Sequence, residues 1–137
     1  TESGIQNIDR IEISVICTRV PVIDGHTAVV HVTFKENIPT LDQIKSIWTD
    51  FKGIPQDQNF PMAPKQPIIY FEEENRPQPK LDRNLEKGMA VSVGRLAEDK
   101  FFDIRYVALS HNTVRGAAGG AILMAELLVK KGYIKRI

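Results

Sequence analysis

Arg19 and His26 form the pair of side chains whose types and spacing best suit chemistry in this sequence of 137 residues. Between them lie Pro21 and the turn-forming pair Asp24 and Gly25. A planar guanidinium suits bidentate capture of a carboxylate, and a neutral imidazole can accept a proton near pH 7. A bend between the two residues would bring both side chains to one end of a sheet. The alternative interpretation is a surface arginine paired with a carboxylate and an ordinary turn histidine.

A second candidate region covers residues 110–121, SHNTVRGAAGGA, which open a predicted helix. Each glycine costs about 1 kcal/mol relative to alanine in a helix interior, so close approach of another backbone or of a ligand should offset that cost. Asn112 would either cap the helix or offer its amide to an amide ligand. For the glycines and alanines, tight packing without a ligand is the favoured alternative. The region matches neither the dinucleotide-binding motif nor the phosphate loop.

The remaining reactive residue types carry weaker signals. Cys17 lies on the same predicted strand face as Arg19, among apolar residues, which favours a buried, inert thiol over a nucleophile. As the single cysteine it cannot form an internal disulfide, which fits a reducing cytoplasm. His31 and His111 have no partners at metal-ligand spacing, so no metal site is expected.

Hydrophobic periodicity predicts the elements that must position these residues. Alternation in steps of two indicates strands over residues 10–20 and 26–35, and further strands are expected over 68–71, 89–96 and 101–109. In the second strand, the residues that share one face are Ala28, Val30, Val32 and Phe34, and in the last they are Phe102, Ile104, Tyr106 and Ala108.

Helices are expected over residues 40–51, with Thr40 as the N-cap, and over 112–131, ending at Gly132. The centre of the last helix, Ala121–Val129, is apolar on nearly every side apart from Glu126, which is typical of a buried helix. Residues 53–66 and 72–87 should be loops, and the charges of the second loop favour a solvated surface or the border of a subunit contact. These elements predict an α+β fold, a largely antiparallel mixed sheet of about five strands with helices packed on it.

The composition is ordinary for a globular domain, with 42% hydrophobic and 26% charged residues and a formal charge of +1. That charge gives no reason to expect nucleic acid or an anionic membrane as a partner. No apolar run approaches the length that a bilayer requires, and the polar start TESGIQNIDR lacks the apolar core of a signal peptide. The expected location is therefore the cytoplasm.

Four segments together resemble the archaeal and fungal branch of the aspartate-semialdehyde dehydrogenases. They are CTRVPVIDGHT at 17–27, RPQPKLDR at 76–83, GMAVSVGR at 88–95 and HNTVRGAAGGA at 111–121. The resemblance covers nearly the whole chain, in the right order. It implies the fold of the C-terminal domain of glyceraldehyde-3-phosphate dehydrogenase-like enzymes. Residues 1–110 would belong to the catalytic and dimerisation domain, and residues 111–137 to a helix that returns to an NADP-binding domain absent here.

The resemblance also implies a reaction and roles for single residues. Family members form a cysteine thioester and use NADP to interconvert aspartyl 4-phosphate and aspartate 4-semialdehyde, in lysine, methionine and threonine biosynthesis. Arg19 matches the arginine that holds the α-carboxylate of the substrate, and His26 matches the acid/base histidine. Asn112 matches the residue that contacts the nicotinamide carboxamide, and Gly116 follows it on the same helix start, so both would bind the cofactor.

One departure from the family pattern limits what this segment can do. The nucleophilic cysteine, the Gly-rich NADP loop and the lysine and acidic residue that help to bind phosphate and substrate all lie upstream in the family. Nothing in these 137 residues replaces them. The segment is therefore expected to be inactive alone.

Two alternatives remain open. Malonyl-CoA and succinyl-CoA reductases, which use NADPH, resemble the same branch, and a carboxylate clamp serves their substrates as well. The segment could also be a non-catalytic dimerisation module, because the sheet of the family's catalytic domain forms the subunit interface. A homodimer or homotetramer is expected in each case.

Overall fold

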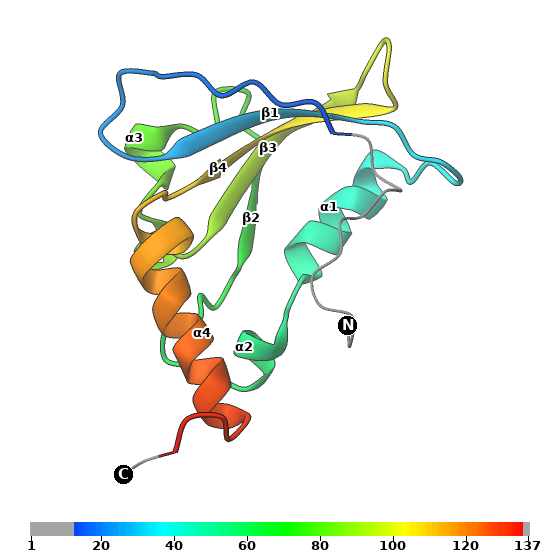
Figure 1. Cartoon of the computed structure of the whole chain (residues 1–137). Coiled ribbons are helices and arrows are strands. Elements are labelled where there is room, and N and C mark those ends of the chain that lie inside the picture. The colour runs from blue at the N-terminus through cyan, green and yellow to red at the C-terminus, as the bar shows by residue number, and fades with distance from the viewer. Residues whose placement is uncertain (1–12, 136–137) are drawn as a thin grey trace.

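A computed structural model describes residues 13–135 and contains one four-stranded sheet (Figure 1). The strands are β1 (His26–Val32), β2 (Ile68–Phe71), β3 (Val91–Glu98) and β4 (Ile104–Ser110), in the order β1-β4-β3-β2. The β1–β4 and β3–β4 pairs are antiparallel, and β2 runs parallel to β3. This mixed, largely antiparallel sheet with helices packed on it confirms the predicted α+β class.

Within residues 13–135, four α-helices connect or flank the strands. They are α1 (Leu41–Asp50), α2 (Ile54–Asp57), α3 (Pro79–Asp82) and α4 (Gly119–Lys130). A 3-10 helix, η1 (Leu85–Gly88), follows α3, and a π-helix, η2 (Val114–Ala118), leads into α4. Both predicted loops therefore contain short helices, which periodicity cannot detect because they last about one turn.

The predicted start of α1 is confirmed in detail. The Thr40 hydroxyl accepts a hydrogen bond from the Gln43 backbone N–H at 3.2 Å, and the Gln43 side-chain oxygen accepts one from the Thr40 N–H at 2.8 Å. This reciprocal pair is a capping box, and it satisfies two backbone donors that the first turn leaves without helical partners.

The predicted apolar faces of β1 and β4 are also confirmed. Ala28, Val30 and Val32 of β1 lie opposite Ala108, Tyr106 and Ile104 of β4, so the two sets share one face. Helix α1 packs on that face through Trp48, whose ring centroid lies 5.0 Å from that of Tyr106 and 6.0 Å from that of Tyr70.

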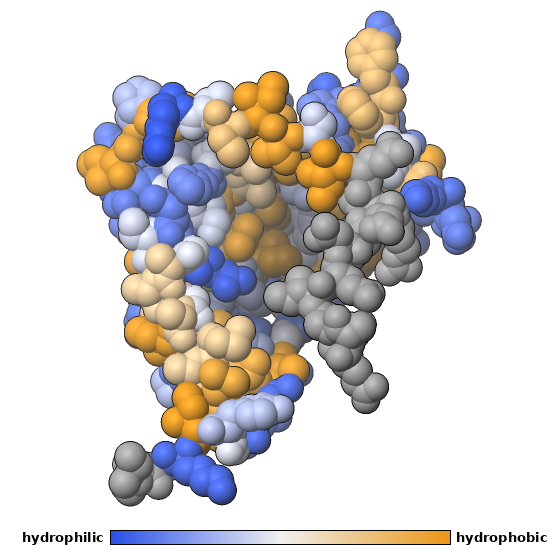
Figure 2. Space-filling model, viewed as in Figure 1, coloured by the Kyte–Doolittle hydropathy of each residue, from blue (hydrophilic) through white to orange (hydrophobic). Residues whose placement is uncertain are grey.

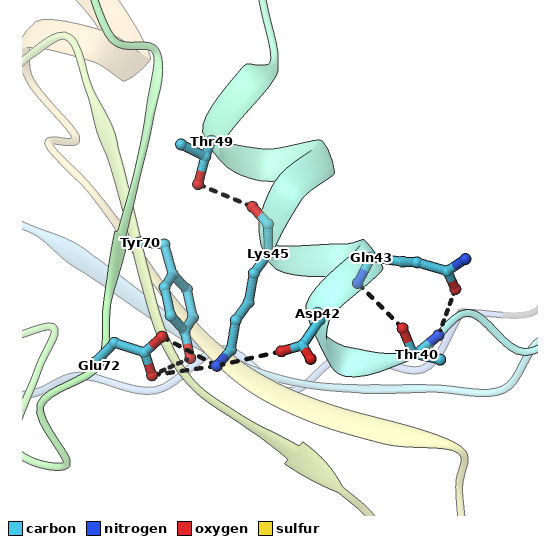
Figure 3. Close-up of polar contacts among 7 residues, drawn as sticks. All are labelled: Thr40, Asp42, Gln43, Lys45, Thr49, Tyr70 and Glu72. Atoms are coloured by element: carbon cyan, nitrogen blue, oxygen red, sulfur yellow. Dashed lines mark hydrogen bonds and ion pairs between the residues drawn. The ribbon is translucent and has the colours of Figure 1, made fainter.

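An exposed ion pair fastens α1 to the end of β2 (Figure 3). The Lys45 ammonium lies 3.0 Å from a Glu72 carboxylate oxygen and 5.4 Å from the centroid of the Tyr70 ring. The hydrogen bond to Glu72 is the main reason that the pKa of Lys45 is raised. Because the Glu72 side chain is 71% exposed, water competes for both charges and the pair contributes little to stability.

The charged loop after β2 is not the fully solvated surface that its composition predicts. Arg76 stacks over the Phe71 ring, with its guanidinium carbon 4.3 Å from the ring centroid, and forms a bidentate pair with Asp82. The Asp82 side chain has no exposed area and also accepts a hydrogen bond from the Gln78 N–H at 2.6 Å. A methyl group on Gly94 of β3 would lie 2.7 Å from the Arg76 carbonyl oxygen, so the loop crosses the sheet in direct contact with it.

The strand predicted over residues 10–20 is wrong for residues 13–20, and residues 10–12 lie outside the described part of the chain. Residues 13–20 have no regular secondary structure and join no ladder, and Ile13, Val15 and Ile16 are exposed. Alternation defines two faces but does not supply a hydrogen-bonding neighbour, and β1 pairs only with β4 among the described strands. For the same reason Cys17 is exposed, not buried as predicted.

The predicted burial of the last helix is also wrong for this chain. Helix α4 extends away from the end of the sheet, and apolar side chains lie on its visible surface (Figures 1 and 2). Ile122, Met124 and Val129 are each at least 50% exposed. Glu126 anchors the helix, because its carboxylate oxygens accept the Met62 N–H at 3.1 and 3.2 Å. The predicted end at Gly132 is confirmed by its positive φ of 77°.

None of the helices in the described part of the chain is long and apolar enough to cross a bilayer.

Replacing Arg76 should destabilise the fold more than replacing Lys45, although Arg76 pairs with one carboxylate and Lys45 with two, those of Glu72 and Asp42. In Arg76→Gln the buried Asp82 carboxylate loses its partner, whereas in Lys45→Gln the exposed Glu72 carboxylate stays solvated. Thermal unfolding followed by circular dichroism should give a clearly lower midpoint for Arg76→Gln and a small shift for Lys45→Gln. Equal shifts of the midpoint would show that burial of Asp82 does not determine how much the Arg76–Asp82 ion pair contributes to stability.

Candidate functional site

A side-chain hydrogen bond joins the two segments that carry the sequence signals, next to the ladder pair of His26 with Ser110. The backbone N–H of Gly25 donates to the side-chain oxygen of Asn112 at 2.8 Å, across 87 residues of sequence. This contact joins the bend before His26 to the segment that opens the last helix. The structure therefore brings His26 and Asn112, two of the predicted site residues, to the same end of the sheet.

Gly25 is required at the bend for two reasons. Its φ is +111°, a conformation that residues with a side chain rarely adopt. A Cβ placed there would lie 3.1 Å from Leu109 Cδ1 and 3.2 Å from Pro79 Cβ. Pro79 belongs to α3, which the Arg76–Asp82 pair holds in place. Sequence reasoning missed the contact between Pro79 and Gly25. The only sequence signal for the importance of this segment was the resemblance of residues 76–83 to the family.

His26 is the first residue of β1 and pairs with Ser110, the last residue of β4. By alternation it belongs to the same sheet face as Ala28 and Val30. Its side chain is exposed. An accessible imidazole at the end of a ladder is free to reach a substrate, and its backbone is held on one side by a rigid strand.

Arg19 is not brought into contact with the other predicted site residues. It lies in the exposed segment before β1, which has no regular secondary structure, and no hydrogen bond or ion pair connects it to another described residue. A tight turn follows it, because the Val22 N–H donates to the Val20 carbonyl at 2.9 Å. The predicted bend is present between Arg19 and His26, but it leaves the guanidinium in solvent.

The start of the last helix is a π-helix anchored by His111. The buried His111 ring accepts the Val114 N–H at its Nδ1 at 3.3 Å, and the Thr113 hydroxyl lies 3.3 Å from the same nitrogen. The Gly116 N–H donates to the His111 carbonyl at 3.0 Å, a bond that spans five residues and widens the turn.

The three glycines of this region differ in what surrounds them. A Cβ on Gly119 would overlap Met89 Sδ and lie 2.8 Å from Met62 Cε, and one on Gly120 would lie 2.7 Å from the Arg115 carbonyl oxygen. Tight packing, the favoured alternative, thus explains these two. Gly116 is exposed, and a Cβ there would meet only the His111 carbonyl oxygen, at 3.8 Å. Packing therefore does not explain Gly116.

Two hollows in the described part of the chain lie away from this site. One of about 370 Å³ is lined by residues of the β1–α1 connection and of the β3–β4 turn, among them Ile38, Asp99 and Phe102. The other, of about 840 Å³, lies beside it along α1. Both are at the opposite end of β1 from His26. Within residues 13–135, no group of three or more acidic, histidine or cysteine side chains could hold a metal ion.

Comparison with known proteins places these observations in a family. Residues 1–115 match the family model described as the semialdehyde dehydrogenase dimerisation domain. The aspartate-semialdehyde dehydrogenase of Schizosaccharomyces pombe is 49% identical over 136 residues, which are 98% of this chain and 38% of that protein. The enzyme of the same name from the archaeon Methanothermobacter thermautotrophicus is 44% identical and covers 93% of this chain and 37% of its own length.

A third relative has a different name. The malonyl CoA reductase (NADP) of Metallosphaera sedula is 46% identical over 131 residues, 94% of this chain and 36% of that protein. The chain spans well under half the length of each of these three relatives.

Solved structures agree with the predicted fold. The crystal structure of aspartate semialdehyde dehydrogenase with NADP from Candida albicans matches with a TM-score of 0.77 and 42% identity, over 85% of this chain and 33% of that one. Aspartate semialdehyde dehydrogenase II from Vibrio cholerae matches with a TM-score of 0.61 and 28% identity, over 82% and 29%. The shared sequence motifs, the matching sheet and the family model lead to one conclusion: the chain belongs to the semialdehyde dehydrogenase family and corresponds to its dimerisation domain.

Proposed function

We propose that this chain is the catalytic and dimerisation portion of an NADP-dependent aspartate-semialdehyde dehydrogenase. The complete protein would reduce aspartyl 4-phosphate to aspartate 4-semialdehyde and release phosphate. The observation that carries the proposal is the hydrogen bond from Gly25 to Asn112, which unites the proposed acid/base segment with the proposed cofactor segment. Residues 1–110 would form the catalytic and dimerisation domain, and residues 111–137 would return to a cofactor domain.

Arg19 would hold the α-carboxylate of the substrate. Its guanidinium offers two parallel N–H donors that match the two carboxylate oxygens, a geometry that lysine cannot reproduce. Because the side chain is exposed here, it can close on a substrate without first breaking an ion pair to another described residue.

His26 would carry the proton of the reaction. A neutral imidazole can take the proton of a nucleophilic thiol, and the resulting imidazolium can return a proton to the oxygen of the reduced carbonyl. The thiol itself must come from another segment of the complete protein, since Cys17 belongs to the segment before His26 and not to the family's nucleophile position. We therefore expect this chain to be inactive by itself.

Asn112 and Gly116 would hold the nicotinamide end of the cofactor. The Asn112 oxygen is engaged by Gly25, and its amide nitrogen makes no hydrogen bond to another described residue, so it retains donors for a carboxamide oxygen. The open surface at Gly116 admits a flat ring close to the backbone. When bound, NADPH would supply the hydride. The residues present thus fit this end of the cofactor.

A malonyl-CoA or succinyl-CoA reductase is the second candidate. The Metallosphaera sedula relative favours it, because its 46% identity lies between the values for the two aspartate-semialdehyde dehydrogenases. A guanidinium clamp at Arg19 would bind the free carboxylate of malonyl-CoA equally well.

The substrate can be decided by assaying the complete protein with both candidates. We expect NADP reduction with aspartate semialdehyde and phosphate, and no oxidation of NADPH with malonyl-CoA or succinyl-CoA. Turnover with malonyl-CoA alone would favour the second candidate.

His26→Gln should lower kcat by about 100-fold or more, and Arg19→Ala should mainly raise KM for the carboxylate substrate. If neither substitution lowered kcat/KM by about tenfold, both catalytic assignments would be wrong.

Gly116→Ala separates a cofactor role from a packing role. The added methyl group meets only ordinary contacts, and alanine has the higher helix propensity. The substitution should therefore raise the free energy of unfolding by up to about 1 kcal/mol, and with it the thermal midpoint. In the complete protein the same methyl should weaken NADPH binding several-fold, as measured by fluorescence titration. Gly120→Ala is the matched control: its methyl would press on the Arg115 carbonyl and should lower the midpoint. Unchanged NADPH affinity in Gly116→Ala would remove Gly116 from the cofactor site.

A further inference from the structure

Asn112 has a contact that a cofactor role does not explain. Its side-chain oxygen accepts the backbone N–H of Gly25 at 2.8 Å in a partly buried position. Because the partner is an N–H donor, the amide group must present its oxygen and not its nitrogen to Gly25. The amide orientation is therefore fixed by the protein itself.

The hydrogen bond acts on the residue directly before His26. Gly25 is buried and closely bounded by Leu109 and Pro79, so these two contacts also restrict its position. On its other side, His26 is held in the ladder opposite Ser110. The short segment 110–112 thus restrains the backbone at Gly25, through Asn112, and at His26 itself, through Ser110.

The middle residue of that segment keeps it in place. His111 is 6% exposed, and its ring is fixed by the Val114 N–H and packs near Gly88, where a Cβ would lie 3.2 Å from its Cδ2 atom. His111 therefore anchors the segment in the core, while Ser110 and Asn112 both act on the strand that bears His26. Contacts with the core thus restrain the backbone that bears the exposed His26 imidazole.

We propose that Asn112 is a positioning residue for His26, acting through its side-chain oxygen on Gly25. This inference rests on the proposed function, in which His26 is the acid/base. It assigns the two halves of one amide to separate tasks: the oxygen fixes the bend before His26, and the nitrogen remains available for the cofactor. A shift of about 1 Å in a catalytic group can cost about 100-fold in rate, so losing this restraint should be visible in kcat.

The test compares Asn112→Ala with Asn112→Asp in the complete protein. Asn112→Ala removes both halves of the amide, and it should lower kcat by roughly 10- to 100-fold and raise KM for NADPH. Asn112→Asp keeps an acceptor for Gly25 but has no amide donors, so it should recover most of the lost kcat while KM for NADPH stays raised. Its added charge should also move the pH-rate limb assigned to His26 to higher pH. Asn37→Ala, an exposed asparagine on the β1–α1 connection, is the control and should change neither parameter.

A second measurement does not depend on activity. Hydrogen exchange of the Gly25 amide, followed by NMR or mass spectrometry, should be slow in the wild type and in Asn112→Asp and faster in Asn112→Ala. If the protein turned over neither candidate substrate, the proposed function would fail while the exchange result still tested the restraint. The positioning role would be overturned by unchanged kcat in Asn112→Ala, by a kcat in Asn112→Asp as low as in Asn112→Ala, or by equal Gly25 exchange in all three proteins. If Asn112→Ala did not fold, slow Gly25 exchange in Asn112→Asp would support the role and fast exchange would overturn it.

Discussion

The antiparallel ladder between β1 and β4 is the interaction on which the rest of the site depends. It pairs residues from His26 opposite Ser110 to Val32 opposite Ile104, although the two strands are far apart in sequence. The observed register puts apolar residues of both strands on the same face, and a slip of one residue would turn every β1 side chain to the other side. The register therefore determines which residue stands next to Ser110.

The second constraint is the close approach of backbone segments over the other face of the sheet. The loop that contains Arg76 crosses β3 at Gly94, and α3 closes on Gly25 through Pro79. These approaches work only because glycine leaves room, and they are stabilised by an ion pair whose carboxylate is fully buried. The fold thus uses a charged, proline-rich segment as a structural brace, in a place where composition alone indicates a surface loop.

Sequence patterns predicted what depends on local chemistry and missed what depends on a distant partner. The faces of β1 and β4, the capping box at Thr40 and the end at Gly132 follow from side-chain alternation, cap residues and glycine conformation, all of which are local. The absence of a ladder for residues 13–20 and the exposure of α4 could not be foreseen. Alternation and apolarity indicate a face that is expected to be buried, but they do not identify the element that would pack against it. The contact of Gly25 with Asn112 was likewise hidden, since neither residue type reveals a partner 87 residues away.

The alternation of residues 110–112 has a consequence for how the family can vary in length. Ser110 completes the ladder, His111 enters the core and Asn112 faces the bend at Gly25. Inserting or deleting one residue within this tripeptide would send the wrong side chain to each of the three places. Loops such as the one between β3 and β4 carry no comparable restriction. We therefore expect the spacing between the last strand and the last helix to be constant among functional relatives, even where the lengths of surface connections differ.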